Sequence, residues 1–170
     1  FKVEAQYAAY LNIIRCIDLT TLTGGDTSGR VRRLCKKALW PLDSAIAAKY
    51  PGITVGAVCV HPAMVADAAK AVARKIPVAS VATNFPSGQS FQAVKVTEIE
   101  MAIDMGATEI DVVISRGKAL EGNWKMVKEE LGYFQAVCGD RAKMKIILGV
   151  GDLETMEQIA RASEVALEVC

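Results

Sequence analysis

The chain has 170 residues, of which 52% are hydrophobic and 23% are charged, a composition typical of one globular domain with an apolar core. Its formal net charge is +1, so no field of one sign is available to attract nucleic acid or an anionic membrane. No run reaches the roughly 18 apolar residues that a membrane span needs, and no signal peptide is recognised. We therefore expect a cytoplasmic protein that binds neither nucleic acid nor membrane.

Short apolar runs rich in β-branched residues recur along the chain and end in turn residues such as glycine, proline and asparagine. In chain order the predicted strands are residues 13–19, 53–60, 78–83, 109–114 and 144–150. Near-continuous apolar strands are typical of parallel sheets that are covered on both faces.

Longer segments with helical spacing of apolar residues follow each predicted strand. These predicted helices are residues 26–39, with an Asp or Thr cap, then 62–74, 91–105, 123–137 and 153–169. The second begins with Pro62 in its first turn, where the missing N–H costs nothing. A strand–helix unit repeated five times without a linker predicts a single α/β domain over residues 1–170.

Two architectures fit this order of elements. An open doubly wound sheet would be complete with five strands, whereas a (β/α)8 barrel needs eight strands and about 250 residues. The dinucleotide fingerprint is absent, because Gly149-Val150-Gly151-Asp152 does not match GxGxxG. The pattern of elements alone leaves this choice open.

The cysteines give no sign of a metal site or a disulfide framework. There are five, an odd number, and no two form a CxxC pair: Cys16, Cys35, Cys59, Cys138 and Cys170. Reduced thiols in a cytosolic protein are the simpler interpretation. We therefore expect no zinc site built from these cysteines.

Three charged residues stand inside otherwise apolar strands: Asp18, Asp111 and Lys145. Strand alternation places Asp111 on the face opposite Ile110 and Val112. A charge in such a place must be paired, so these groups are expected to pair with one another. The network could simply hold the strands in register, or it could relay protons, because coupled and desolvated groups have shifted pKa values.

Other polar residues lie near the predicted strand ends. Cys59 is interpreted as a small core residue because no base stands near it in the sequence to activate it. His61, the only histidine, could line a strand mouth or lie in a surface loop. Thr20 and Thr21 could present hydroxyl groups at the end of the first strand or only start a turn.

The strand segments resemble the deoxyribose-phosphate aldolase family in sequence, order and spacing. The matching motifs are Ile-Asp-Leu-Thr-Thr-Leu at 17–22, Ala-Val-Cys-Val at 57–60, Val-Ala-Thr-Asn-Phe-Pro-Ser-Gly at 81–88, Gly-Ala-Thr-Glu-Ile-Asp-Val-Val-Ile at 106–114 and Lys-Ile-Ile-Leu at 145–148. The resemblance implies a TIM barrel, of which this chain covers strands one to five. It also implies a class I aldolase, which needs neither a metal nor another cofactor and cleaves 2-deoxy-D-ribose 5-phosphate to D-glyceraldehyde 3-phosphate and acetaldehyde through a lysine imine.

The resemblance also implies roles for single residues. Asp111 matches the proton-transfer aspartate, Lys145 a lysine that supports the charge network without forming the imine, and Asp18 an aspartate that shapes the polar centre. In the substrate pocket, Thr20 and Leu22 match residues that line the sugar site, and Cys59 matches a cysteine near it. The implied partner is a small phosphosugar, and a homodimer is expected.

Two departures from the family pattern limit the resemblance. Residues 149–153 read Gly-Val-Gly-Asp-Leu where the family has a Thr-Gly-Glu-Leu-like segment, so Val150 replaces a threonine hydroxyl. No segment matches the family's sixth-strand motif with the imine lysine or its seventh-strand motif with a second lysine. We expect these residues to be part of a longer product and to be inactive alone. The second hypothesis is a non-catalytic scaffold or binding protein. The third is an open-sheet binder of phosphosugars or nucleotides.

Overall fold

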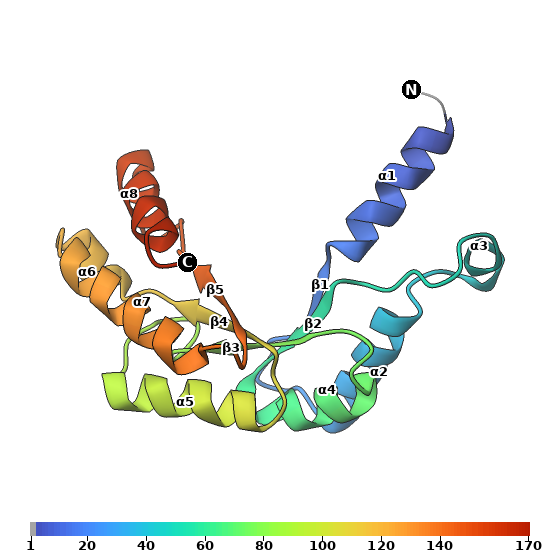
Figure 1. Ribbon diagram of the computed structural model, residues 1–170, viewed down its shortest axis with the longest axis horizontal. Helices are drawn as coiled ribbons and strands as arrows, with labels where there is room; N and C mark the ends of the chain where they lie inside the picture. Colours follow the sequence, from blue (N-terminus) through green and yellow to red (C-terminus); the bar gives the residue numbers. More distant parts are fainter. Residues whose placement is uncertain (1–2) are drawn as a thin grey trace. The chain divides into compact units, whose positions relative to one another are not determined.

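Strands and helices alternate in the computed structural model, which describes residues 3–170 (Figure 1). The five strands form one parallel sheet in the order β1-β2-β3-β4-β5. The elements are α1 (Val3–Arg15), β1 (Asp18–Thr20), α2 (Ser28–Leu39), α3 (Ser44–Lys49), β2 (Ala57–Val60), the 3-10 helix η1 (Pro62–Met64), α4 (Val65–Val72), β3 (Val78–Ala82), α5 (Gln92–Asp104), β4 (Glu109–Val113), α6 (Arg116–Leu120), α7 (Trp124–Cys138), β5 (Lys143–Ile147) and α8 (Met156–Leu167).

The chain forms two compact units, Phe1–Ala79 and Ser80–Cys170. In the first unit, α2 packs beside α4, and both helices contact β2 (Figure 1). Every residue of β2 is buried, as predicted for a strand covered on both faces. The two helices contribute further core residues: Val31, Cys35, Ala38, Val65, Ala68 and Val72.

In the second unit, α5 packs against β4 and α7 against β5, and the two helices contact each other. Strands β4 and β5 pair in parallel, with Asp111 opposite Lys145. Ile110 and Val112 are fully buried, whereas Glu109 and Asp111 remain partly exposed. The predicted alternation of β4 is therefore confirmed: its apolar face joins the core and leaves the charged side chains on the other face.

The first predicted strand, residues 13–19, is wrong at its beginning. Residues up to Arg15 complete helix α1, and the strand extends only over Asp18–Thr20. The two β-branched residues Ile13 and Ile14 resemble a strand locally, but they continue the helix that begins at Val3. The second strand also begins later than predicted, at Ala57.

Other differences lie at the ends of elements. The helix predicted over 62–74 is η1 followed by α4, and Ala73 and Arg74 adopt left-handed conformations that end it. The fifth strand ends at Ile147 because the chain turns at Gly149, where φ is 67°. Three helices, α1, α3 and α6, were not predicted.

Helix caps explain several of the observed boundaries. The Thr27 hydroxyl accepts the Arg30 amide at the start of α2, which confirms the predicted cap. Thr155 accepts the Gln158 amide in the same way, so α8 begins at Met156 rather than at residue 153. Among residues 3–170, no helix is both long enough and apolar enough to cross a membrane.

Candidate active site

A cluster of three charges lies on the polar face of β4 and β5. The Lys145 Nζ atom is 3.1 Å from Asp111 Oδ1 and 3.1 Å from Glu109 Oε2. The strand pairing places Lys145 directly opposite Asp111, and Glu109 precedes Asp111 by two residues on the same face. The side chains of Glu109 and Asp111 are 16% and 13% exposed, so the carboxylates are largely withdrawn from water while the cluster remains accessible.

This cluster contains groups that can move protons. Each carboxylate can accept or return a proton, and the ammonium offsets one of the two negative charges. The structure brings together Asp111 and Lys145, as the sequence predicted, and adds Glu109. Glu109 could have been found from the sequence, because it stands two residues before Asp111 and residues i and i+2 of one strand share a face. In residues 3–170, no group of three or more His, Cys, Asp or Glu side chains is arranged to hold a metal ion.

The chain after β3 adopts an unusual conformation next to the end of β4. Thr83 and Asn84 both have left-handed backbones, with φ of 59° and 60°, which is strained for a β-branched residue. The buried Thr83 hydroxyl accepts the Val113 amide at 2.6 Å and lies 2.7 Å from the Ala82 carbonyl, to which it donates. This side chain therefore ties the end of β3 to the end of β4.

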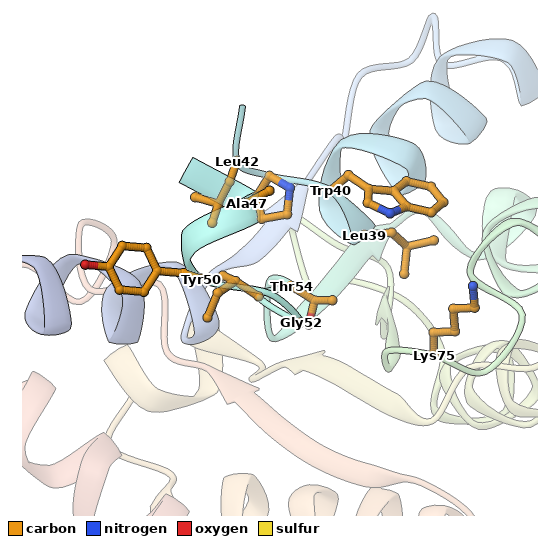
Figure 2. A pocket seen from close by; sticks show the side chains of 10 residues that line it. Leu39, Trp40, Leu42, Ala47, Tyr50, Gly52, Thr54 and Lys75 are labelled. Atoms are coloured by element: carbon orange, nitrogen blue, oxygen red, sulfur yellow. The ribbon is translucent and has the colours of Figure 1, made fainter. Parts of the chain in front are cut away.

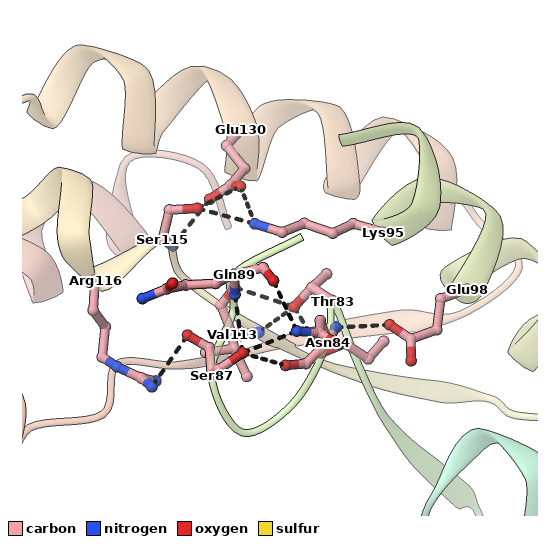
Figure 3. Close-up of polar contacts among 11 residues, drawn as sticks. Thr83, Asn84, Ser87, Gln89, Lys95, Glu98, Val113, Ser115, Arg116 and Glu130 are labelled. Atoms are coloured by element: carbon pink, nitrogen blue, oxygen red, sulfur yellow. Dashed lines mark hydrogen bonds and ion pairs between the residues drawn. The ribbon is translucent and has the colours of Figure 1, made fainter. Parts of the chain in front are cut away.

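Asn84 organises the loop that follows (Figure 3). Its side-chain amide donates to Ser87 Oγ and to the Gln89 carbonyl, both at 2.9 Å. Its backbone amide donates to Glu98 Oε2 at 2.8 Å, which fastens the loop to α5. These contacts hold the strained backbone in place.

A buried ion pair between α5 and α7 also fixes the chain after β4 (Figure 3). Lys95 Nζ lies 2.6 Å from Glu130 Oε1, and the Lys95 side chain is only 2% exposed. The ammonium also donates to Ser115 Oγ at 2.9 Å, while the Ser115 amide donates to Glu130 Oε2 at 3.1 Å. Three elements are thereby joined at Ser115, the residue before α6.

The other predicted site residues belong to the first unit. Asp18 and Thr20 are exposed in β1, where the Thr20 hydroxyl donates to the Asp18 carbonyl at 2.8 Å. Leu22 is half-buried, and its carbonyl lies 3.3 Å from Nε2 of His61. Cys59 is buried in β2, with 3% of its surface exposed, as expected for a core residue. The roles of these residues in a site stay predictions.

The loop after β1 is organised by a carboxylate. Asp26 accepts hydrogen bonds from the hydroxyl groups of Thr21 and Thr23 at 2.9 Å and 3.0 Å, and from the Thr23 amide at 3.1 Å. Desolvation raises the pKa of Asp26, but these hydrogen bonds outweigh it and leave the pKa below its ordinary value. Thr21 therefore serves in a turn, one of the two predicted alternatives.

A cavity of about 280 Å³ also lies in the first unit, between the end of α2 and the segment before β2 (Figure 2). Leu39, Trp40 and Tyr50 line it together with Lys75, whose Nζ atom is 5.8 Å from the Trp40 ring. No carboxylate contributes to the lining, so this cavity lacks the paired acid and base groups found on β4 and β5.

Known proteins resemble nearly the whole chain in sequence. A model described as DeoC/LacD family aldolase matches residues 12–169. The chain belongs to this family. Deoxyribose-phosphate aldolases from Bos taurus and Homo sapiens are each 44% identical over 98% of this chain and 54% of their own length. The chain thus spans about half the length of the curated relatives it matches.

Solved structures of the family have the same fold. An aldolase named QR15 gives a TM-score of 0.78 at 25% identity, covering 93% of this chain and 64% of its own. The deoxyribose phosphate aldolase from Aeropyrum pernix gives 0.72 at 22% identity, covering 94% and 61%. The five strands are therefore part of a (β/α) barrel, which resolves the choice that the sequence pattern left open.

Proposed function

We propose that the full-length protein is a deoxyribose-phosphate aldolase that reversibly cleaves 2-deoxy-D-ribose 5-phosphate to D-glyceraldehyde 3-phosphate and acetaldehyde. The observation that supports this best is the charge cluster on β4 and β5. It places Asp111 within 3.1 Å of Lys145 in a chain that is 44% identical to curated deoxyribose-phosphate aldolases.

The proposed reaction proceeds through a lysine imine. The amine condenses with the substrate carbonyl and water leaves. A hydroxyl group then loses its proton, the carbon–carbon bond breaks, and glyceraldehyde 3-phosphate departs while the bonding electrons form an enamine. Protonation of the enamine carbon and hydrolysis release acetaldehyde and restore the lysine. Asp111 takes and returns protons in these steps, working through a water molecule.

Lys145 has a supporting role in this proposal. An imine-forming lysine must present a neutral amine, whereas Lys145 contacts two carboxylates at 3.1 Å. Such an ammonium is suited to keeping Asp111 in position and to balancing charge. The imine would instead form on a lysine of a strand that is not among the five described here.

Four of the predicted substrate-site residues belong to the first unit. We assign Asp18 to the polar centre, Thr20 and Leu22 to the sugar pocket and Cys59 to its surroundings. All four are placed in β1, in β2 or directly after β1. In parallel α/β barrels the carboxyl ends of the strands form the active-site face, which supports this assignment for Thr20 and Leu22.

The first experiment is borohydride trapping on the full-length protein. Incubation with acetaldehyde and borohydride should increase the intact mass by one reduced adduct, and peptide mapping should place it on a lysine other than Lys145. Cleavage of 2-deoxyribose 5-phosphate should be measured on the same preparation. Absence of both adduct and cleavage would favour a non-catalytic scaffold, and an adduct on Lys145 would overturn its supporting role.

Substitution of Asp111 tests the proton-transfer role. Asp111→Asn keeps the shape of the side chain but removes its basicity, so kcat should fall about 100-fold or more. The matched control is Asp140→Asn, because Asp140 is an exposed turn residue of the same unit and its loss should leave kcat unchanged. Equal kcat values for Asp111→Asn and wild type would show that Asp111 does not transfer protons.

We propose that the protein acts in deoxyribonucleotide catabolism in the cytoplasm and that it forms a homodimer. The relatives' names support the phosphosugar substrate, and light scattering on the full-length protein tests the dimer. A monomer or a tetramer in solution would contradict it.

A further inference from the structure

Arg116 connects three separate loops of the second unit. Its Nη2 atom donates to the Pro86 carbonyl at 2.7 Å and to the Ser87 carbonyl at 3.3 Å (Figure 3). Its Nε atom lies 2.7 Å from Asp152 Oδ2. Arg116 begins α6 directly after β4, while Pro86 follows β3 and Asp152 follows β5. One side chain therefore links the loops at the carboxyl ends of three consecutive strands.

The guanidinium group is packed against backbone rather than extended into water. The Arg116 side chain is only 14% exposed, although its partner Asp152 is 64% exposed. A Cβ atom added at Gly149 would lie 2.6 Å from Arg116 Cδ and 2.8 Å from Nη1. The loop after β5 thus passes directly over the arginine stem. The planar guanidinium group carries several N–H donors in fixed directions, so it can bind two carbonyls on one side and a carboxylate on another.

The backbone on which Arg116 stands is itself fixed. The preceding residue, Ser115, is bound through its amide and its hydroxyl group to Glu130, and its hydroxyl also accepts from Lys95. This network is buried, so the start of α6 has little freedom to move. Any displacement at Arg116 is therefore expected to come from loss of its own contacts.

Two of the loops that Arg116 joins follow the strands that carry the charge cluster. The loop after β3 begins with the strained Thr83 and Asn84, and a strained backbone persists only when its surroundings over-determine it. The strands that end at the other two loops bear Asp111 and Lys145. Their 3.1 Å contact depends on the register of β4 against β5, and the Arg116–Asp152 pair joins the segments that follow these two strands.

We propose that Arg116 is a positioning residue of the aldolase, which fastens the loops after β3, β4 and β5 so that Asp111 and Lys145 keep their geometry. The proposal rests on the proposed function. It assigns Arg116 no contact with the substrate, because its Nε and Nη2 donors are already bound to Asp152 and to the two carbonyls. Its effect should therefore fall on kcat rather than on recognition of the phosphate group.

The kinetic test uses the full-length protein with Arg116→Met, Arg116→Lys and Asp152→Asn. Arg116→Met should lower kcat roughly 10- to 100-fold, the range that small misplacements of reacting groups produce, with KM changed less than about threefold. Arg116→Lys should recover little of the lost kcat, since one ammonium cannot replace the several fixed N–H donors of the guanidinium group. Asp152→Asn should have a smaller effect, and adding it to Arg116→Met should cause no further loss. Lys118→Met is the matched control and should leave kcat unchanged. Lys118 lies on the same helix as Arg116, but it pairs with exposed Glu121.

A second substrate separates positioning from phosphate binding. Arg116→Met should reduce cleavage of 2-deoxyribose 5-phosphate and of unphosphorylated 2-deoxyribose by the same factor. A loss confined to the phosphorylated substrate, or a kcat within twofold of wild type, would overturn the proposal. Thermal unfolding of Arg116→Lys checks that its fold is retained, so that a kinetic loss in this variant is not caused by unfolding.

Hydrogen exchange provides a measurement that does not depend on activity. Amide exchange in residues 83–89 and 149–154 should accelerate together in Arg116→Met and stay at the wild-type rate in Lys118→Met. Unchanged exchange in either segment would overturn the linkage. If the wild-type protein cleaves neither substrate, the proposed function fails, and exchange still decides whether Arg116 fastens these loops.

Discussion

The loops at the strand ends are stabilised differently in the two units. In the first unit, a carboxylate meets neutral donors: Asp26 binds the hydroxyl groups of Thr21 and Thr23, three to five residues away. In the second unit, opposite charges meet over long separations, as in the Lys95–Glu130 and Arg116–Asp152 pairs, which are 35 and 36 residues apart.

This difference determines how far a perturbation spreads. A carboxylate that loses a hydroxyl donor in an exposed turn is solvated by water, so the damage stays within that turn. A buried charge that loses its partner has no such replacement, and its desolvation penalty remains. The second unit should therefore respond to single substitutions more strongly, and over a wider region, than the first.

The largest effect on stability is expected from Lys95→Met. The substitution leaves Glu130, which is 10% exposed, without its ammonium partner, and should cost about 3–5 kcal/mol of unfolding free energy. Urea unfolding of the full-length protein measures it. The double variant Lys95→Met/Glu130→Leu should recover most of the loss, because no unpaired charge remains. A single variant as stable as wild type would remove the distinction between the two units.

The helix caps are neutral and local in both units, so their loss should cost the same in each. Thr27 accepts an amide at 3.3 Å and Thr155 accepts one at 3.2 Å. Thr27→Ala and Thr155→Ala should each cost about 1 kcal/mol, while Thr27→Ser and Thr155→Ser should stay close to wild type. Unequal losses from the two alanine variants would mean that the units differ in more than their charge pairing.

The smallest effect is expected from Asp26→Asn, and it should depend on pH. The pKa of Asp26 lies below its ordinary value of 3.8, so the ionised form is stabilised by folding. The advantage of wild type over Asp26→Asn should be complete above the unfolded pKa and be lost as pH falls through the lower folded pKa. Thermal unfolding between about pH 2 and pH 6 measures this difference. A stability difference between wild type and Asp26→Asn that grows as the pH falls would contradict the lowered pKa of Asp26.

The sequence predicted the parts of the fold that follow from short-range periodicity. The alternation of Ile110, Asp111 and Val112 identified the buried face of β4, because side chains alternate with a period of two. Helix α1 was not predicted, and its end was predicted as a strand because the β-branched residues Ile13 and Ile14 have the composition of a strand. The short helices α3 and α6 have too few turns to produce a periodic signal.

The candidate site was predictable only where residues face each other across paired strands. Asp111 and Lys145 both interrupt apolar runs, so they were found and expected to pair. Arg116 was not found, because its partners include backbone carbonyls at Pro86 and Ser87, and any residue type presents a carbonyl. Contacts of this kind become visible only when the loops have been placed in space.

The two faces of β4 have a consequence for natural variation in chain length. The turn before the strand includes Gly106, whose φ is 109°, and it fixes which residues point to each side. Deleting one residue there would shift the register by one and exchange the faces, burying Asp111 under the helices and presenting Ile110 in its place. Insertions and deletions should therefore be tolerated in residues 106–108 only in pairs, although Gly106 and Thr108 are exposed and exposed turns ordinarily accept changes in length.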